Sequence, residues 1–368
     1  MAYNNTELSE QYVTQSAFSQ ARLKIKPEAF IELSQDSINH FYSCYQVKRW
    51  HGFRLIAIDG SEVMLPKNKE TIEEYGEYQT NFMNKTVVLA RISKAYDVLN
   101  NISIDAKLVN RKIGEHTLAK EHLKHFGEGD LALYDRGYPS YDLFKNTLAS
   151  GIHFCARVAI SNWAIARKLV ETGEIEIITE IIPGHGLVKA YKELGLDYEP
   201  IKCRFICIEL STGEKEVLLT SLTDIEKYPY ELFKELYHQR WYVEEAYKKD
   251  KHRLQLENFS GNSLIAIQQD FYAKILLGNI TSILSSDLDQ QISIKRKNIK
   301  YRYQINSTTA LAKVKEILTY LFTRANIIYL LEKLILMFLS NIEPIRPNRS
   351  FNRYQDKRKR YYKTYLSL

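Results

Sequence analysis

Two aspartates follow short apolar runs in the same local setting, and this repetition is the first sign of chemistry in the sequence. Residues 55–58 lead into Asp59 and residues 131–134 lead into Asp135, each with a glycine one or two positions later. Such runs are typical of strands buried on both faces that end where glycine turns the chain. Ligand-binding and catalytic groups in open α/β sheets gather at that edge. The alternative, two ordinary turn dipeptides, stays open on this evidence alone.

A third set of polar side chains falls on one face of an expected helix. Residues 230–252 contain no glycine and no proline, and their apolar residues have helical spacing. At about 100° per residue, four functional side chains share a stripe about 60° wide: Tyr237, Arg240, Glu244 and Lys251. Such a stripe is unsuited to a core, and the flanking Trp241 and Val243 favour a half-buried groove. The alternative is a solvated face, since Arg240 and Glu244 also form an i,i+4 pair.

The spacing of this stripe, Tyr-x2-Arg-x3-Glu-x6-Lys, resembles the signature of the insertion sequence 4-type transposases, which are DDE transposases. Three further motifs are similar to those of the family and follow in its order. They are the first-aspartate motif at residues 58–61, with Leu65 and Pro66 downstream, the second at residues 135–138, and the strand before the glutamate helix at residues 219–222. The resemblance covers about residues 16 to 320.

The resemblance implies an α/β fold with an RNase H-like catalytic core, interrupted by a β-rich insertion. Asp59 and Asp135 would lie on adjacent strands and Glu244 on a helix beyond the insertion, and these three would be the catalytic carboxylates. They would bind two Mg²⁺ ions, for which Mn²⁺ can substitute. This is chemically sensible, because two cations about 3.5–4 Å apart can stabilise both oxygens of a phosphodiester exchange. Magnesium prefers oxygen ligands.

By the same resemblance, Tyr237, Arg240 and Lys251 would hold DNA phosphates near the cleavage point, with Arg136 of the second motif as a further contact. Arginine suits a bidentate phosphate contact, lysine a point charge and tyrosine a neutral donor. The implied reaction is cleavage of transposon-end DNA and strand transfer into target DNA. The implied partners are double-stranded DNA, as inverted-repeat ends and target, and a second copy of the chain in the DNA complex.

Charge is concentrated at one end of the chain. The net charge of +7 equals the excess in residues 346–368, which hold eight basic residues and one acidic residue. Tyrosines are interleaved among them, which favours a phosphate-binding tail, and a solvated tail is the alternative. Four cysteines make no disulfide framework, and Cys203 and Cys207 are expected on one face of a buried strand. No signal peptide or membrane span is expected, so a cytoplasmic protein is the default. The resemblance implies that it is bacterial and nucleoid-associated.

The pattern of helical and strand-like stretches along the sequence predicts six segments. We expect a helical N-terminal region at 1–50, the first part of the catalytic core at 51–151, a β-rich insertion at 152–225, the second part of the core with the glutamate helix at 226–275, a C-terminal helical region at 276–345 and a basic tail at 346–368. Residues 16–22 resemble a piece of the family's end-reading region. Most members begin well before this point, so end recognition would be weakened if the N-terminal region is incomplete.

Other functions are weighed against this one. A catalytically inactive, transposase-derived DNA-binding protein is the main alternative, although all three acidic positions are intact. A phosphatase with Asp59 as its nucleophile is the second, but it needs neither a basic tail nor the stripe. Some members of the family hold a flipped base with a tryptophan before the strand at 219–222. Glu216 and Val217 stand there, so a hairpin route would need another aromatic residue, such as Trp163.

Overall fold

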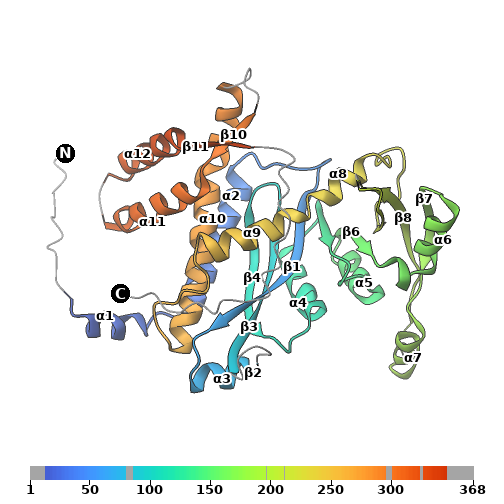
Figure 1. Cartoon of the computed structure of the whole chain (residues 1–368), viewed down its shortest axis with the longest axis horizontal. Coiled ribbons are helices and arrows are strands. Elements are labelled where there is room, and N and C mark those ends of the chain that lie inside the picture. Colours follow the sequence, from blue (N-terminus) through green and yellow to red (C-terminus); the bar gives the residue numbers. More distant parts are fainter. Residues whose placement is uncertain are drawn as a thin grey trace. The chain divides into compact units, whose positions relative to one another are not determined.

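The structure, a computed structural model, describes residues 13–79, 86–195, 197–210, 212–295, 301–323 and 326–345 (Figure 1). The chain divides into two compact units, each described here by itself. The sheet unit comprises residues 45–64 and 72–249, and the helical unit comprises residues 1–44, 65–71 and 250–368. Among the described residues, no helix is long and apolar enough to cross a membrane.

A single nine-stranded sheet forms the centre of the sheet unit, in the order β2-β3-β1-β5-β6-β9-β8-β7, with β4 also paired to β3. Its strands are β1 (Arg54–Leu65), β2 (Glu77–Gln79), β3 (Thr86–Asp97), β4 (Ile102–Asn110), β5 (Asp130–Tyr134), β6 (His153–Val158), β7 (Glu176–Ile181), β8 (Ile201–Glu209) and β9 (Lys215–Thr220). Strands β3 and β4 form an antiparallel pair, whereas β1, β5 and β6 run parallel. The backbone N–H of Val98, directly after β3, donates to the Leu55 carbonyl near the start of β1, so β3 and β1 run in opposite directions.

The order β4-β3-β1-β5-β6 is that of an RNase H-like core, so the expected fold class is confirmed. The apolar runs form its two central strands: every side chain from Leu55 to Ile58 and from Leu131 to Tyr134 is fully buried. Burial on both faces explains why these runs do not alternate with polar residues. They also bring the residues that follow them to one edge of the sheet.

The strands of residues 152–225 continue the same sheet. Strand β6 pairs with β5, and the antiparallel strands β9, β8 and β7 extend the sheet beyond it. This segment also contains the short helix η2 (Ile160–Asn162), α6 (Ala164–Thr172) and α7 (His185–Glu193). Helix α6 lies beside β7 and β8 in Figure 1. Cys203 and Cys207 are buried in β8, as the strand pattern predicted.

Helices of the sheet unit pack on its strands. Two short helices follow β4, namely α4 (Glu115–His122) and η1 (Leu123–His125), and α5 (Tyr141–Ala149) follows β5. Ser140 caps α5 by accepting a hydrogen bond from the Leu143 N–H at 3.2 Å. Helix α8 (Leu232–His238) and most of α9 (Trp241–His252) also belong to this unit, whereas α3 (Lys69–Tyr75) and the end of α9 cross its sequence boundary.

Helices dominate the other unit. It contains α1 (Gln15–Arg22), α2 (Glu28–Cys44), α10 (Leu264–Lys295), α11 (Ser307–Thr323) and α12 (Ile327–Ser340), with a small antiparallel sheet of β10 (Arg302–Ile305) and β11 (Ile342–Ile345). Side chains of α10, α11 and α12 share one apolar core that includes Leu288, Val314 and Phe338.

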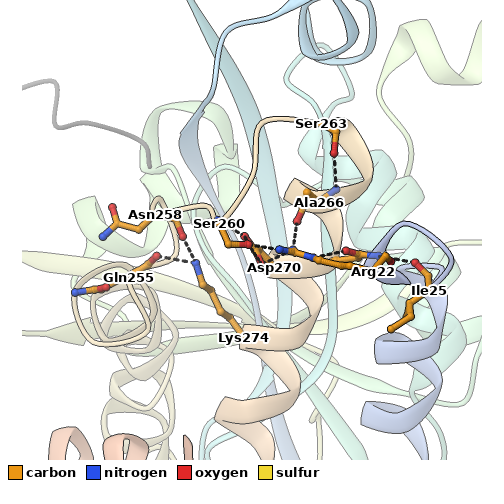
Figure 2. A network of polar contacts seen from close by, with 10 residues as sticks. Arg22, Ile25, Gln255, Asn258, Ser260, Ser263, Ala266, Asp270 and Lys274 are labelled. Carbon is orange, nitrogen blue, oxygen red and sulfur yellow. Dashed lines mark hydrogen bonds and ion pairs between the residues drawn. The ribbon is translucent and has the colours of Figure 1, made fainter. Parts of the chain in front are cut away.

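A polar network ties the N-terminal helix to α10 (Figure 2). The Arg22 guanidinium donates to Gln269 and Asp270, each at 2.7 Å, and to Ser260. One turn further along α10, Lys274 donates to the carbonyls of Gln255 and Asn258. Arg22 belongs to residues 16–22, which resemble the family's end-reading region. Its guanidinium therefore already makes hydrogen bonds within this unit. The predicted basic tail, residues 346–368, lies outside the described residues.

Candidate active site at the carboxyl edge of the sheet

The two aspartates lie side by side, as the resemblance implied. Strands β1 and β5 pair in parallel with Ile58 opposite Tyr134, so the next residues, Asp59 and Asp135, meet at the same edge. The expected turn is present after Asp135, whose carbonyl accepts from the Tyr138 N–H at 3.0 Å. The expected turn after Asp59 is wrong, because β1 continues as a strand to Leu65. Glycine permits a turn but does not enforce one where an extended backbone fits.

Asp59 lies in an environment that disfavours its charge. Burial, opposed by the Gly60 N–H and by Arg240 and assisted by the negative charges of Glu244 and Asp135, raises the pKa of Asp59 to about 6. The Gly60 N–H donates to Asp59 Oδ1 at 2.8 Å. The Tyr247 hydroxyl of α9 donates to the Asp59 carbonyl oxygen at 2.7 Å and so fixes this helix against the strand.

Asp135 lies among cations instead. Its Oδ1 is 2.9 Å from Arg157 Nη2, 3.9 Å from Arg240 Nη2 and 3.4 Å from the Tyr237 hydroxyl. Burial alone would raise the pKa of Asp135, but Arg240, the Arg136 N–H and Arg157 outweigh it and lower the pKa below its usual value. Asp135 is therefore held ionised.

The predicted single helix over residues 230–252 is wrong. Helix α8 ends at His238, α9 begins at Trp241, and tight turns join them: the Arg240 N–H donates to the Tyr237 carbonyl and the Val243 N–H to the Arg240 carbonyl, both at 3.1 Å. These i to i+3 bonds change the angle per residue, so the calculated stripe does not hold across the break. The turn still brings Tyr237 and Arg240 to the edge with the aspartates.

Three of the four stripe residues meet at this edge. Arg240 Nη2 is 3.0 Å from Glu244 Oε1, so its guanidinium bridges Glu244 and Asp135. Tyr237 and Arg240 are almost fully buried, not on a solvated face. Lys251 lies in the last turn of α9, beyond the boundary of the sheet unit, and its phosphate contact stays a prediction. Arg136 is exposed beside the edge, and its role is likewise untested.

The neighbouring glutamates are clearly distinguished. The Glu244 side chain is 25% exposed and faces Arg240, whereas the Glu245 side chain is 61% exposed and pairs with Lys248. This separation agrees with the helical register predicted within α9, where Glu244 and Glu245 point about 100° apart.

Arg157 on β6 is a residue of the site that the sequence reasoning missed. Its guanidinium bridges Asp135 and Glu216 of β9. An arginine within a mostly buried strand, two positions after Cys155, is a signal that could have identified it. Glu216 occupies the place where a base-holding tryptophan was sought, and here it orients Arg157.

The donor set fits a hard divalent cation. All three side chains offer carboxylate oxygens, and the pKa of Asp59 is raised by burial and then by Glu244 and Asp135, a mutual repulsion that a bound cation relieves. No three His, Cys, Asp or Glu side chains within the described part of the chain already form a metal-holding group. Asp135 and Glu244 are instead turned toward arginines. Asp59, Asp135 and Glu244 are the residues that would hold the ion.

Comparison with known proteins places the chain in a family. Residues 50–280 match the family model of the transposase DDE domain, and the chain belongs to this family. It is 22% identical over 272 residues to the transposase InsG for insertion sequence element IS4 of Escherichia coli (strain K12), a match that covers 73% of this chain and 60% of that protein. The chain therefore spans less than two thirds of that relative. The resemblance to insertion sequence 4-type transposases is confirmed.

Among solved structures, the chain is similar to the piggyBac transposase in its synaptic complex with hairpin DNA. The TM-score is 0.42 and the identity 11%, with 83% of this chain and 60% of that chain covered.

Proposed function

We propose that this protein is a transposase that cleaves transposon-end DNA and transfers the freed strand into target DNA, with Asp59, Asp135 and Glu244 as its catalytic carboxylates. The observation that carries the proposal is the meeting of three carboxylates at one edge of an RNase H-like sheet, within the span that matches the transposase DDE domain. The inactive DNA-binding alternative would need no such set, and the phosphatase alternative would need no family match.

The buried arginines define what this edge can do. Arg240 is 1% exposed, and its Nε and Nη1 have no hydrogen-bond partner among the described residues. A desolvated guanidinium with unused donors attracts a phosphate oxygen strongly. Tyr237 lies beside it as a neutral donor, and Arg157 orients Asp135. In this proposal, Arg240 and Tyr237 position a DNA phosphate, with Lys251 and Arg136 as further backbone contacts.

Two bound divalent cations, Mg²⁺ or Mn²⁺, would activate the attacking oxygen and stabilise the leaving oxygen. The residues of the chain then have separate tasks. The carboxylates would hold the ions. Arg157 of β6 and Arg240 of the α8–α9 turn orient the carboxylates and the phosphate, and burial keeps water from screening these interactions. We also propose that two copies of the chain pair two transposon ends on bacterial DNA in the cytoplasm.

Cleavage of a labelled transposon-end duplex tests the function. We expect Mg²⁺ or Mn²⁺ to support cutting and Ca²⁺ to support binding without cutting. Equal cutting in excess EDTA would contradict the two-metal proposal. Sedimentation of the complex with one and with two ends present tests the pairing of two copies, and a complex that contains one copy in both cases would contradict it.

The tail offers a separate test of DNA as the partner. Removing residues 346–368 deletes the whole excess of positive charge, so affinity for any duplex should fall. Each lost phosphate contact should reduce the slope of log K against log salt by about 0.9. Duplex binding between low and moderate salt measures this slope. An unchanged slope would show that the tail does not touch DNA.

A further inference from the structure

A buried lysine projects from the same face of the sheet as Asp59. The Val98 N–H of β3 donates to the Leu55 carbonyl of the antiparallel strand β1, so four residues along each strand Lys94 lies opposite Asp59. The irregularity of the β3–β4 pair leaves its extra residue on β4, and the count along β3 is unaffected. Directly opposite residues of an antiparallel pair share one face. Lys94, which is 1% exposed, is therefore enclosed on the side of the sheet that bears the Asp59 side chain.

Two aromatic rings contact this ammonium. Lys94 Nζ lies over the rings of Tyr96 and Tyr247, 5.5 Å and 5.3 Å from their centroids. A cation within about 6 Å of a ring centroid is attracted to the face of the ring, most strongly where water is excluded. Tyr247 is itself buried and belongs to α9. The contact therefore joins β3 to the helix that carries Glu244.

Tyr247 also contacts the strand that carries the first carboxylate. Its hydroxyl donates to the Asp59 carbonyl oxygen at 2.7 Å. In α9 it follows Glu244 by three positions, so the two side chains lie about 60° apart around the helix and are neighbours on its surface. One side chain thus links the backbone of Asp59 to the turn of α9 that bears Glu244. The separation of these two carboxylates depends on where Tyr247 is held.

We propose that Tyr247 is a positioning residue, which holds Glu244 at the separation from Asp59 that a divalent cation requires, and that Lys94 acts through Tyr247 by fixing its ring. Magnesium demands nearly octahedral geometry with oxygen ligands at about 2.0–2.1 Å, so the spacing of the carboxylates affects its affinity. Groups that orient metal ligands without touching the ion typically change metal affinity by about 10–100-fold. The inference rests on the proposed function, since Asp59 and Glu244 are its ion ligands.

Titration of the metal-free full-length chain with Mn²⁺, followed by the electron paramagnetic resonance signal of the free ion, tests this role without DNA. Tyr247→Phe keeps the ring and removes only the hydroxyl, and we expect it to bind Mn²⁺ at least about 10-fold more weakly. Tyr242→Phe is the matched control, the same substitution in the same helix at a side chain that is 46% exposed, and it should bind as the wild type does. A merely structural role would lower the urea midpoint of Tyr247→Phe and leave its Mn²⁺ affinity unchanged, which would overturn the proposal.

A double-mutant cycle tests whether Lys94 acts through Tyr247. Lys94→Met keeps an unbranched apolar side chain and removes the ammonium, so it should weaken Mn²⁺ binding. Tyr247→Leu removes both the ring and the hydroxyl. Adding Lys94→Met to Tyr247→Leu should therefore weaken binding no further than Tyr247→Leu alone. Wild-type affinity in Lys94→Met, or losses that multiply in the double variant, would overturn the role of Lys94.

Duplex cleavage by the same proteins separates this inference from the proposed function. In Tyr247→Phe we expect half-maximal cleavage to need a higher Mg²⁺ concentration, while duplex binding in Ca²⁺ is unchanged. A wild type that binds Mn²⁺ more tightly than Tyr247→Phe but never cuts DNA contradicts the function alone. A wild type that cuts DNA while Tyr247→Phe matches its Mn²⁺ affinity contradicts the positioning role alone.

Discussion

Asp59 and Asp135 have the same local sequence setting and neighbouring strands, yet their environments are opposite. Asp59 is buried beside other carboxylates and its pKa is raised to about 6. Asp135 has Arg157 and Arg240 on one carboxylate oxygen, and its pKa is lowered. The cations come from β6 and from the turn between α8 and α9, both distant in sequence from either motif.

In the proposed function, the protein itself holds Asp135 ionised, and a bound cation would neutralise Asp59. An ion pair with arginine keeps Asp135 ionised and oriented before any cation binds. Asp59 holds its charge at a cost in folding free energy, and a bound cation would recover that cost. Sites that sacrifice stability in this way are typical of function.

The largest effect should come from removing a carboxylate from the set. Glu244→Gln should fold and bind DNA but lose most cleavage, because losing one such electrostatic group typically costs about 10²–10³ in rate. Glu245→Gln is the matched control, since the Glu245 side chain is 61% exposed and pairs with Lys248, and it should cost little. Single-turnover cleavage of an end duplex, with binding checked in Ca²⁺, measures both. A dead Glu245→Gln beside an active Glu244→Gln would show that the assigned helix register is wrong.

The second effect tests the comparison directly through stability. Without metal at pH 7.5, Asp59→Asn should stabilise the fold, because a pKa raised from 3.8 to about 6 corresponds to at most about 3 kcal/mol of unfavourable charge. Asp135→Asn should destabilise it by about 1–3 kcal/mol, since Arg157 and Arg240 lose an ionised partner. Urea unfolding of both variants gives the free energies. Changes of the same sign would remove the distinction between the two aspartates.

Removing Arg157, an arginine that holds Asp135 ionised, should have a smaller effect on the cleavage rate. Arg157→Gln should slow cleavage about 10-fold, the equivalent of about 1.4 kcal/mol, because Asp135 loses its closest charged partner. Arg167→Gln is the control, since Arg167 of α6 bonds to the Ser161 carbonyl. Single-turnover rates at saturating Mg²⁺ compare the two variants. Equal rates in both would mean that Arg157 does not position Asp135.

The sequence predicted the parts of this site that depend on local pattern. Unbroken apolar runs before Asp59 and Asp135 indicated two buried strands, and parallel neighbours necessarily place the next residues together. The register within α9 follows from helical periodicity, which separates Glu244 from Glu245. The RNase H-like order came from the resemblance, because local pattern does not determine which strands pair.

Other parts depend on contacts that no local pattern contains. Residues 237–242 include no helix breaker, yet the helix is interrupted where Arg240 reaches both Asp135 and Glu244. Strand composition predicted a β-rich segment at 152–225 but not that its strands would extend the central sheet. Arg157 escaped notice because it acts on Asp135 of a neighbouring strand, which is distant in sequence.

The smallest effect is the change of the free energy of unfolding with pH, and it tests whether burial raises the pKa of Asp59. Asp59 binds its proton more tightly in the folded chain than in the unfolded chain, where the pKa is near 3.8. Between about pH 4 and pH 6 the folded state therefore holds more protons, and its stability should fall as pH rises through this window, by at most about 1.4 kcal/mol per pH unit. Asp135 contributes the opposite sign at lower pH, since its folded pKa is depressed.

Many carboxylates contribute to the total curve, so the informative quantity is the difference between wild type and Asp59→Asn, measured by urea unfolding without metal from pH 4 to pH 7. A difference that grows with pH and levels off above about pH 6 assigns the strain to Asp59. A flat difference would mean that Asp59 is solvated well enough to ionise freely, and the contrast with Asp135 would then reduce to the arginines alone.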